Sequence, residues 1–348
     1  MRLSEQNKYP HRRKNILNGE WILVSPHRTQ RPWRGEIAKT DDSNRPSYDP
    51  DCYLCPGNKR ANGETNPDYK KTFVFTNDYS SLLPDIADSN LNRRGLLISK
   101  SERGICRVVN FSPRHDLTLA EMDAVEIENV ISTLQEEVKY LSGKNYINHI
   151  QIFENKGSMM GNSNPHPHCQ IWAQESIPRE PKKELSNFKK YFNANKRSLL
   201  SDYLKLELRL QERVVFENNS FAVLVPFWAV WPFETLIVSK RKFPGLIDLR
   251  AGERKDFASA LSIITVKYDN IFQTSFPYSS GIHQAPTDGK DHKEWHFHMH
   301  FYPPLLRSAS VKKFMVGYEM MAEPQRDITP EYSAQVLRDI PAVHYKKK

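Results

Sequence analysis

Histidine occupies alternate positions in two separate runs of the sequence, and each run closes the same series of predicted elements. The first run is Asn164-Pro165-His166-Pro167-His168 and the second is Trp295-His296-Phe297-His298-Met299-His300. Each follows a predicted strand, a basic turn, an amphipathic helix, a further strand and a loop. A repeated order of this kind indicates an internal duplication of one α+β unit.

The helix of each repeat is predicted from a stripe of apolar residues at helical spacing. In the first half, the capping box Thr118-Leu119-Ala120-Glu121 predicts the start of the helix and Gly143 its end. The predicted buried faces are Ile127, Val130, Ile131, Leu134, Val138 and Leu141 in the first half, and Phe257, Leu261, Ile264, Tyr268 and Ile271 in the second. We expect one half over residues 1–178, a charged, partly helical connector over 179–210, and the other half over 211–348.

Composition restricts the class of protein. The 348 residues are 39% hydrophobic and 26% charged, which are globular values. No apolar run approaches the ~20 residues of a membrane span, and residues 1–6 lack a signal-peptide core. With only four cysteines, we expect a cytoplasmic protein. The net charge of +9 raises the possibility of nucleic-acid binding, but the Lys and Arg residues are largely scattered, which does not favour it.

The first histidine run adjoins a loop suited to binding phosphate. Pro165 and Pro167 exclude a helix interior, and on an extended backbone His166 and His168 point to the same side. Residues 157–163 are rich in Gly, Ser and Asn, whose backbone N–H groups bind phosphate oxygens. An imidazole beside such a loop can act as a nucleophile or base in attack on phosphorus. The alternative is a proline-rich loop with solvent-facing histidines.

The second run lacks such a loop, because the charged residues 288–293 precede it. We therefore assign the chemistry to the first run. Three imidazoles on one strand face, at His296, His298 and His300, instead predict a metal site together with His283. Its fourth ligand is expected to be a carboxylate from elsewhere. An exposed strand face is the alternative interpretation.

Cys52 and Cys55 form a C-x-x-C knuckle typical of zinc sites. The knuckle supplies two ligands, and the candidate partners are His115 and His166. A pair of reduced, unreactive thiols is the alternative.

Several of these motifs together resemble the galactose-1-phosphate uridylyltransferase family, a duplicated branch of the histidine-triad superfamily. The similarity extends over nearly the whole chain. It is carried by His11–Arg13, Trp21–Trp33, Cys52–Gly57, Phe153–Gly157, Ser163–His168, Trp231–Thr235, Tyr268–Asn270, Tyr302–Ala309 and Lys313–Glu319.

The resemblance implies an α+β fold of duplicated histidine-triad-like units, with a largely antiparallel sheet and helices packed on it. It also implies ping-pong transfer of UMP from UDP-glucose to galactose 1-phosphate through a uridylyl-histidine, giving UDP-galactose and glucose 1-phosphate. The expected assembly is a homodimer with active sites shared between subunits, acting in the cytoplasm and without nucleic-acid or membrane partners.

The same resemblance implies individual roles. His168 would be the nucleophile, and Gln170 would hydrogen-bond the transferred phosphate. The positions that match substrate contacts are Arg28, Arg31, Ala61, Asn77, Asp78, Asn155, Gly161, Asn162, Ser163, Lys313, Phe314, Tyr318, Glu319 and Gln325. The metal ligands would be Cys52, Cys55, His115 and His166 for zinc, and Glu184, His283, His298 and His300 for iron or zinc.

Few positions depart from the family pattern. His296 replaces a common glutamine beside the second metal site, Ala61 and Asn162 differ from frequent residues, and Cys169 replaces a glycine of some members. Since Cys169 alternates off the His166/His168 face, we interpret it as a packing residue.

Two other functions are compatible with parts of the sequence. A nucleotide phosphohydrolase or phosphorylase of the same superfamily is one, but the neutral amide of Gln170 cannot protonate a leaving group as a third histidine could. A zinc-knuckle nucleic-acid-binding protein is the other, and it leaves both histidine runs unexplained.

Overall fold

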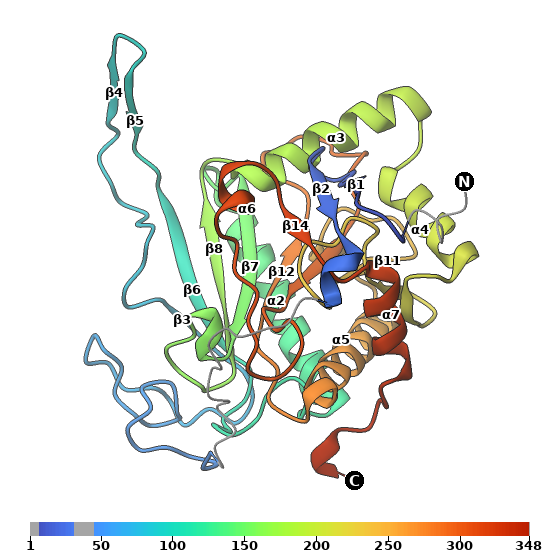
Figure 1. Ribbon diagram of the computed structural model, residues 1–348. Coiled ribbons are helices and arrows are strands. Elements are labelled where there is room, and N and C mark those ends of the chain that lie inside the picture. Colours follow the sequence, from blue (N-terminus) through green and yellow to red (C-terminus); the bar gives the residue numbers. More distant parts are fainter. Residues whose placement is uncertain (1–6, 31–44, 348) are drawn as a thin grey trace.

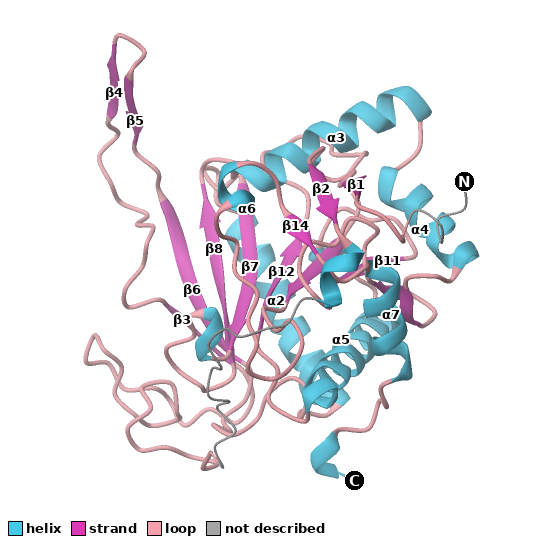
Figure 2. Ribbon diagram, viewed as in Figure 1, coloured by secondary structure: helices cyan, strands magenta, loops and turns pink. Residues whose placement is uncertain are grey.

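The computed structural model describes residues 7–30 and 45–347, and its centre is a nine-stranded sheet in which every neighbouring pair is antiparallel (Figures 1 and 2). In sheet order the strands are β3 (Phe73–Thr76), β6 (Gly104–Asn110), β8 (His168–Gln174), β7 (His149–Lys156), β12 (Tyr278–His283), β13 (His298–Tyr302), β11 (Thr235–Ser239), β10 (Phe221–Leu224) and β9 (Val214–Glu217).

The sheet order shows the duplication directly. β7 and β12 pair at the centre, with Phe153 opposite Gly281. Outward from that pair, β8 and β6 on one side correspond to β13 and β11 on the other. Each histidine run leads into the strand next to the central pair. The predicted fold class is therefore confirmed, whereas the division at residues 178 and 210 stays a prediction because one sheet runs through both halves.

Two long helices, α2 (Ala124–Ser142) and α5 (Ala251–Phe272), pack on one face of the sheet. The six residues predicted for the buried face of α2 are all buried. Alternation along the strands supplies the rest of this core, for example Phe221 and Val223 of β10, while Ala222 and Leu224 face the other side. The hydrophobic core on this face thus joins both halves.

The start of α2 differs from the prediction. The helix is capped by Asp123, whose side chain accepts the N–H of Glu126 while the Glu126 carboxylate accepts the N–H of Asp123. Thr118 and Glu121 interact through a 3.1 Å side-chain hydrogen bond within a turn before the helix. Two capping patterns occur here, five residues apart, and the later one prevails because the apolar helical period begins directly after it.

The other face of the sheet is covered by α3 (Arg179–Asn195) and α4 (Leu199–Leu210), within the segment predicted to be partly helical. Phe188 of α3 packs edge-on against Trp295, with the ring centroids 5.1 Å apart. This packing holds α3 beside the second histidine run.

Smaller elements lie at the periphery. A three-stranded sheet brings segments near the two ends of the chain together, and an isolated hairpin projects from the body (Figure 1). No helix among residues 7–30 and 45–347 is long and apolar enough to cross a membrane. The remaining strands and helices are β1 (His11–Lys14), β2 (Trp21–Val24) and β14 (Gln325–Arg326) in the small sheet, β4 (Asn90–Arg93) and β5 (Leu97–Lys100) in the hairpin, and α6 (Tyr318–Met321) and α7 (Pro330–Asp339).

Candidate active site and metal centres

His168 opens β8, and a backbone hydrogen bond fixes the orientation of its ring. Its Nδ1 lies 2.7 Å from the carbonyl oxygen of His166. Because a carbonyl only accepts hydrogen bonds, Nδ1 carries the proton and Nε2 keeps a free lone pair. Burial lowers the pKa of His168 below its ordinary value, and this hydrogen bond opposes the shift. The neutral ring is therefore favoured, and this is the form in which an imidazole can attack an electrophile.

Two cavities meet at His168. One, of about 230 Å³, is lined by His168 and by the predicted substrate-contact residues Asn155, Asn162 and Ser163. The other, of about 480 Å³, is lined by Ala61, Asn77, Asp78, Ser163, His168 and Gln170. The structure thus gathers six of the predicted substrate-contact positions, together with Gln170, around one imidazole. Gly161 lines neither cavity and instead ends a short 3-10 turn in a left-handed conformation.

The amide of Gln170 is oriented by its neighbours. Its Oε1 accepts from Trp172 Nε1 at 3.0 Å and from Asn77 Nδ2 at 3.4 Å. The amide NH₂ is then the part of Gln170 left to donate to a ligand. Trp172 also lines the larger cavity. Sequence analysis missed Trp172, although its alternation with His168 and Gln170 along one strand was a usable signal.

Cys169 lies on the opposite face of β8, buried in the main core. The packing role inferred from the sequence agrees with this position.

One side of the cavity of about 230 Å³ is formed by buried charged residues, whose role sequence analysis also missed. Lys156 Nζ contacts Asp269 Oδ1 at 2.8 Å, and the same carboxylate accepts the backbone N–H of Phe276 and contacts His344 Nε2 at 3.2 Å. Glu154 lies beside Lys156, and burial raises the pKa of its carboxyl to about 7. The alternation of Glu154 and Lys156 along β7 was the available signal. This network ties the wall of the cavity to the C-terminal segment.

The first predicted metal group comes together as a compact, buried cluster. The ligand atoms of Cys52, Cys55, His115 and His166 all lie within 4.8 Å of one another. Cys55 Sγ is 3.7 Å from His115 Nδ1 and 3.6 Å from His166 Nδ1. These separations fit the edges of a tetrahedron around a metal with bonds of about 2.0–2.3 Å.

The protonation of this cluster also suits a cation. His166 Nε2 donates to the Ser112 carbonyl at 2.9 Å, so Nδ1 presents its lone pair to the cluster. Burial raises the pKa of the Cys55 thiol to about 12. A bound cation reverses that preference, because it stabilises the thiolate directly.

The second predicted metal group also forms. Glu184 of α3 meets His283 of β12 and His298 and His300 of β13, again with ligand atoms within 4.8 Å of one another. Burial opposes ionisation of Glu184, but His283, at 2.8 Å, lowers the pKa of that carboxyl well below its ordinary value. His298 Nε2 and both ring nitrogens of His300 are buried without a hydrogen-bond partner among the described residues. Such unpaired nitrogens beside a carboxylate fit a cation, which would be coordinated by one nitrogen of each ring.

His296 stays outside this group, although its place in the run suggested a contribution. Its Nε2 donates to the Ser239 carbonyl at 2.7 Å, and its Nδ1 faces the hydroxyls of Ser198 and Ser201 at 3.3 and 3.2 Å. His296 is therefore the counterpart of His166, with two serines in place of the metal. His298 correspondingly repeats His168, since its Nδ1 lies 2.8 Å from the His296 carbonyl oxygen.

The remaining predicted substrate residues lie apart from His168. Arg28, Lys313, Phe314, Glu319 and Gln325 line a third cavity of about 220 Å³. Lys313 forms a close ion pair with Glu319. Tyr318 begins α6 nearby and is half exposed. Arg31 lies outside the described residues.

Comparison with known proteins assigns the family. The galactose-1-phosphate uridyl transferase N-terminal domain matches residues 1–178, and the C-terminal domain of that family matches residues 184–348. The chain belongs to the galactose-1-phosphate uridylyltransferase family. It is an enzyme of the nucleotidyltransferase class.

Individual members of the galactose-1-phosphate uridylyltransferase family are similar over their full length. The enzyme of Haemophilus influenzae is 50% identical over 346 residues, which cover 99% of each chain. That of Saccharomyces cerevisiae is 48% identical over 358 residues, which cover 98% of each chain. A solved uridylyltransferase structure is 27% identical, with a TM-score of 0.74 over 94% of this chain and 97% of that one.

Proposed function

We propose that the protein transfers UMP from UDP-glucose to galactose 1-phosphate in two displacements at His168. In the first, Nε2 attacks the α-phosphorus, a P–N bond forms and glucose 1-phosphate leaves with the electrons of the broken P–O bond. In the second, a phosphate oxygen of galactose 1-phosphate attacks the same phosphorus and the P–N bond breaks. The observation that carries the proposal is the Nδ1 contact with the His166 carbonyl, which leaves the Nε2 lone pair free between two cavities.

The surrounding residues support the roles of the two cavities. Asn155 Oδ1 accepts from Ser279 at 2.7 Å, so its NH₂ is free to donate to an anion. Together with the Gly/Ser/Asn segment, it suits the cavity of about 230 Å³ to phosphate and sugar groups. Asn77 and Asp78 in the larger cavity suit the polar edge of uridine.

Incubation with UDP-glucose followed by intact-mass measurement tests this proposal. A gain equal to UMP together with release of glucose 1-phosphate is expected. Hydrolysis to UMP without a sugar phosphate acceptor would favour the phosphohydrolase instead, and phosphate-dependent cleavage would favour the phosphorylase.

We assign zinc to the Cys₂His₂ group, because thiolate and imidazole ligands at tetrahedral spacing favour it. The Glu–His₃ group suits iron or zinc equally well. His166 connects the first metal to the nucleophile, since it is a ligand whose backbone carbonyl also orients His168. The metal there would hold the strand that carries His168 rather than take part in phosphoryl transfer.

The second metal is expected to join the two halves structurally. Glu184→Ala removes the ligand that α3 supplies and should lower metal content and thermal stability while much of the transferase rate remains. The matched control is Glu180→Ala, which removes a 44% exposed carboxylate one turn earlier on the same helix, outside the metal group. Elemental analysis, thermal unfolding and the transfer assay check this expectation. A rate loss as severe as that of His168→Ala would contradict it.

We further propose a homodimer in which the third cavity completes the active site of the partner. The support is that Arg28, Lys313, Glu319 and Gln325, which match substrate-contact positions, line a cavity apart from His168.

Mixing two inactive variants tests this arrangement. His168→Ala and Lys313→Ala subunits, unfolded together and refolded, should regain measurable transfer, because a hybrid dimer has one site with neither substitution. Absence of any recovery in verified hybrids would place both residues in the same subunit's site.

A further inference from the structure

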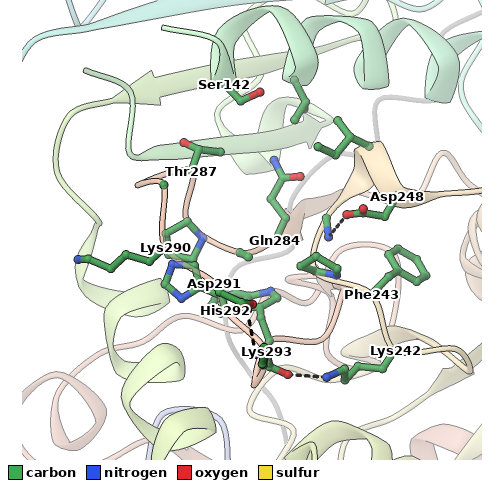
Figure 3. Close-up of a pocket in the computed structure, with 18 residues that line it drawn as sticks. Ser142, Lys242, Phe243, Asp248, Gln284, Thr287, Lys290, Asp291, His292 and Lys293 are labelled. Carbon is green, nitrogen blue, oxygen red and sulfur yellow. Dashed lines mark hydrogen bonds and ion pairs between the residues drawn. The ribbon is translucent and has the colours of Figure 1, made fainter. Parts of the chain in front are cut away.

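A further cleft has no part in the proposed reaction. It measures about 530 Å³ and lies among the end of α2, residues 242–248 after β11 and residues 284–295 between β12 and β13 (Figure 3). This size falls within the usual range of small-molecule sites.

The cleft occupies the same place in the second half that the phosphate cavity occupies in the first. The cavity of about 230 Å³ is formed by residues 117–118 after β6 and by the connection from β7 to β8. Since β6, β7 and β8 correspond to β11, β12 and β13, the cleft is formed by the equivalent connections. Each of the two duplicated units therefore has a cavity beside its histidine run.

The cleft of about 530 Å³ cannot support phosphoryl transfer by the route proposed for His168. His298 is the counterpart of that nucleophile, but its Nε2 faces the Glu184 carboxylate at 3.6 Å. His298 is also absent from the lining of the cleft. A ligand there would be bound without being covalently attached to the protein.

The lining chemistry suits a sugar. Thr287, Gln284 and Asp248 lie around one region of the cleft (Figure 3). Thr287 Oγ1 donates to the Ile147 carbonyl and keeps acceptor capacity, and Asp248 Oδ2 accepts the Gly245 N–H while its Oδ1 remains. The apolar residues Val138, Pro244, Ile247 and Pro286 supply the contacts that the C–H groups of a sugar ring require.

Two further observations indicate a hydrogen-bond acceptor and an anionic group on the ligand. Trp295 lines the cleft, and its buried Nε1 donor has no acceptor among the described residues. Lys242 lies at the other edge, where its ammonium donates to the Lys293 carbonyl and retains further N–H donors (Figure 3). An anionic group at that edge would pair with the ammonium.

We propose that this cleft is a second, non-catalytic site for a hexose monophosphate. The sugar hydroxyls contact Thr287, Gln284 and Asp248, and the phosphate contacts Lys242.

Calorimetric titration of the full chain with galactose 1-phosphate tests the site. We expect two equivalents per chain, one at His168 and one here. Lys242→Met should weaken one of them at least tenfold and leave the transfer rate at low substrate unchanged. The matched control is Lys290→Met, because the Lys290 side chain extends away from the cleft, is 73% exposed and pairs with Asp288 (Figure 3). Both equivalents should survive in that variant.

Asp248→Asn tests the sugar contacts, since asparagine can still accept the Gly245 N–H. It should weaken the second equivalent for galactose 1-phosphate, and neutral galactose and inorganic phosphate should each bind more weakly than the sugar phosphate. A single equivalent in the unmodified protein, an equal loss in Lys290→Met, or inorganic phosphate binding as tightly as the sugar phosphate would overturn the proposal. Two equivalents without any UMP transfer would refute the proposed function and leave this site standing.

Discussion

His168→Ala is expected to eliminate the covalent UMP adduct and to lower the transfer rate by at least about 10⁴-fold, a loss typical of removing an enzyme's nucleophile. The fold and both metals should be retained, because the His168 side chain contributes to neither metal group and makes its hydrogen bond only to a backbone carbonyl. UDP-glucose should still bind. Intact mass, elemental analysis and ligand titration check the three parts separately.

An adduct of UMP mass on the His168→Ala protein would show that another residue is the nucleophile. Loss of metal or of folded structure in this variant would instead show that His168 has a structural role. Retention of full transfer by a route without any adduct would exclude the two-displacement mechanism.

The second large effect is expected at the Cys₂His₂ group. Cys52→Ser should lower metal content and thermal stability together, since zinc binding contributes about 10–16 kcal/mol in isolated zinc peptides and a typical domain is stable by only about 5–15 kcal/mol. Residues 45–72 contain no helix or strand, so a metal bound by Cys52 and Cys55 would add a strong constraint to this segment (Figure 2). We expect a Tm lowered by on the order of 10 °C.

Cys106→Ser is the matched control, because Cys106 is equally buried but lies outside the metal group. It should keep its metal. His166→Ala should behave as Cys52→Ser does, with a further loss of transfer because the carbonyl that orients His168 is displaced. Full zinc stoichiometry in Cys52→Ser, measured by elemental analysis, would show that this group does not bind zinc.

Much of the fold followed from local patterns in the sequence. The apolar stripes predicted the buried faces of α2 and α5, because period and burial are directly coupled in a helix packed on a sheet. The repeated order of elements predicted the duplication. The start of α2 was missed, since two capping patterns within ten residues compete and only the packed structure decides between them.

Less of the candidate site could be predicted from the sequence. The C-x-x-C knuckle and the histidine runs identify ligand types, but Glu184 shows no local signal and entered only through the family resemblance. That His296 lies outside the metal group depends on its contacts with Ser198 and Ser201, which lie far away in the chain. The pairing of Lys156 with Asp269 is equally long-range. Spacing predicts which side chains share a face, whereas their partners depend on tertiary packing.

The antiparallel pairing of β7 with β12 constrains how the chain can be divided. A fragment ending at residue 178 would present β7 as an open edge, with unpaired N–H and C=O groups along a strand whose inner face is apolar. Edges of this kind recruit other strands, and aggregation follows. Expression of either half alone should therefore yield insoluble or self-associated material, whereas co-expression of the two fragments offers each edge its native neighbour and should restore a soluble pair.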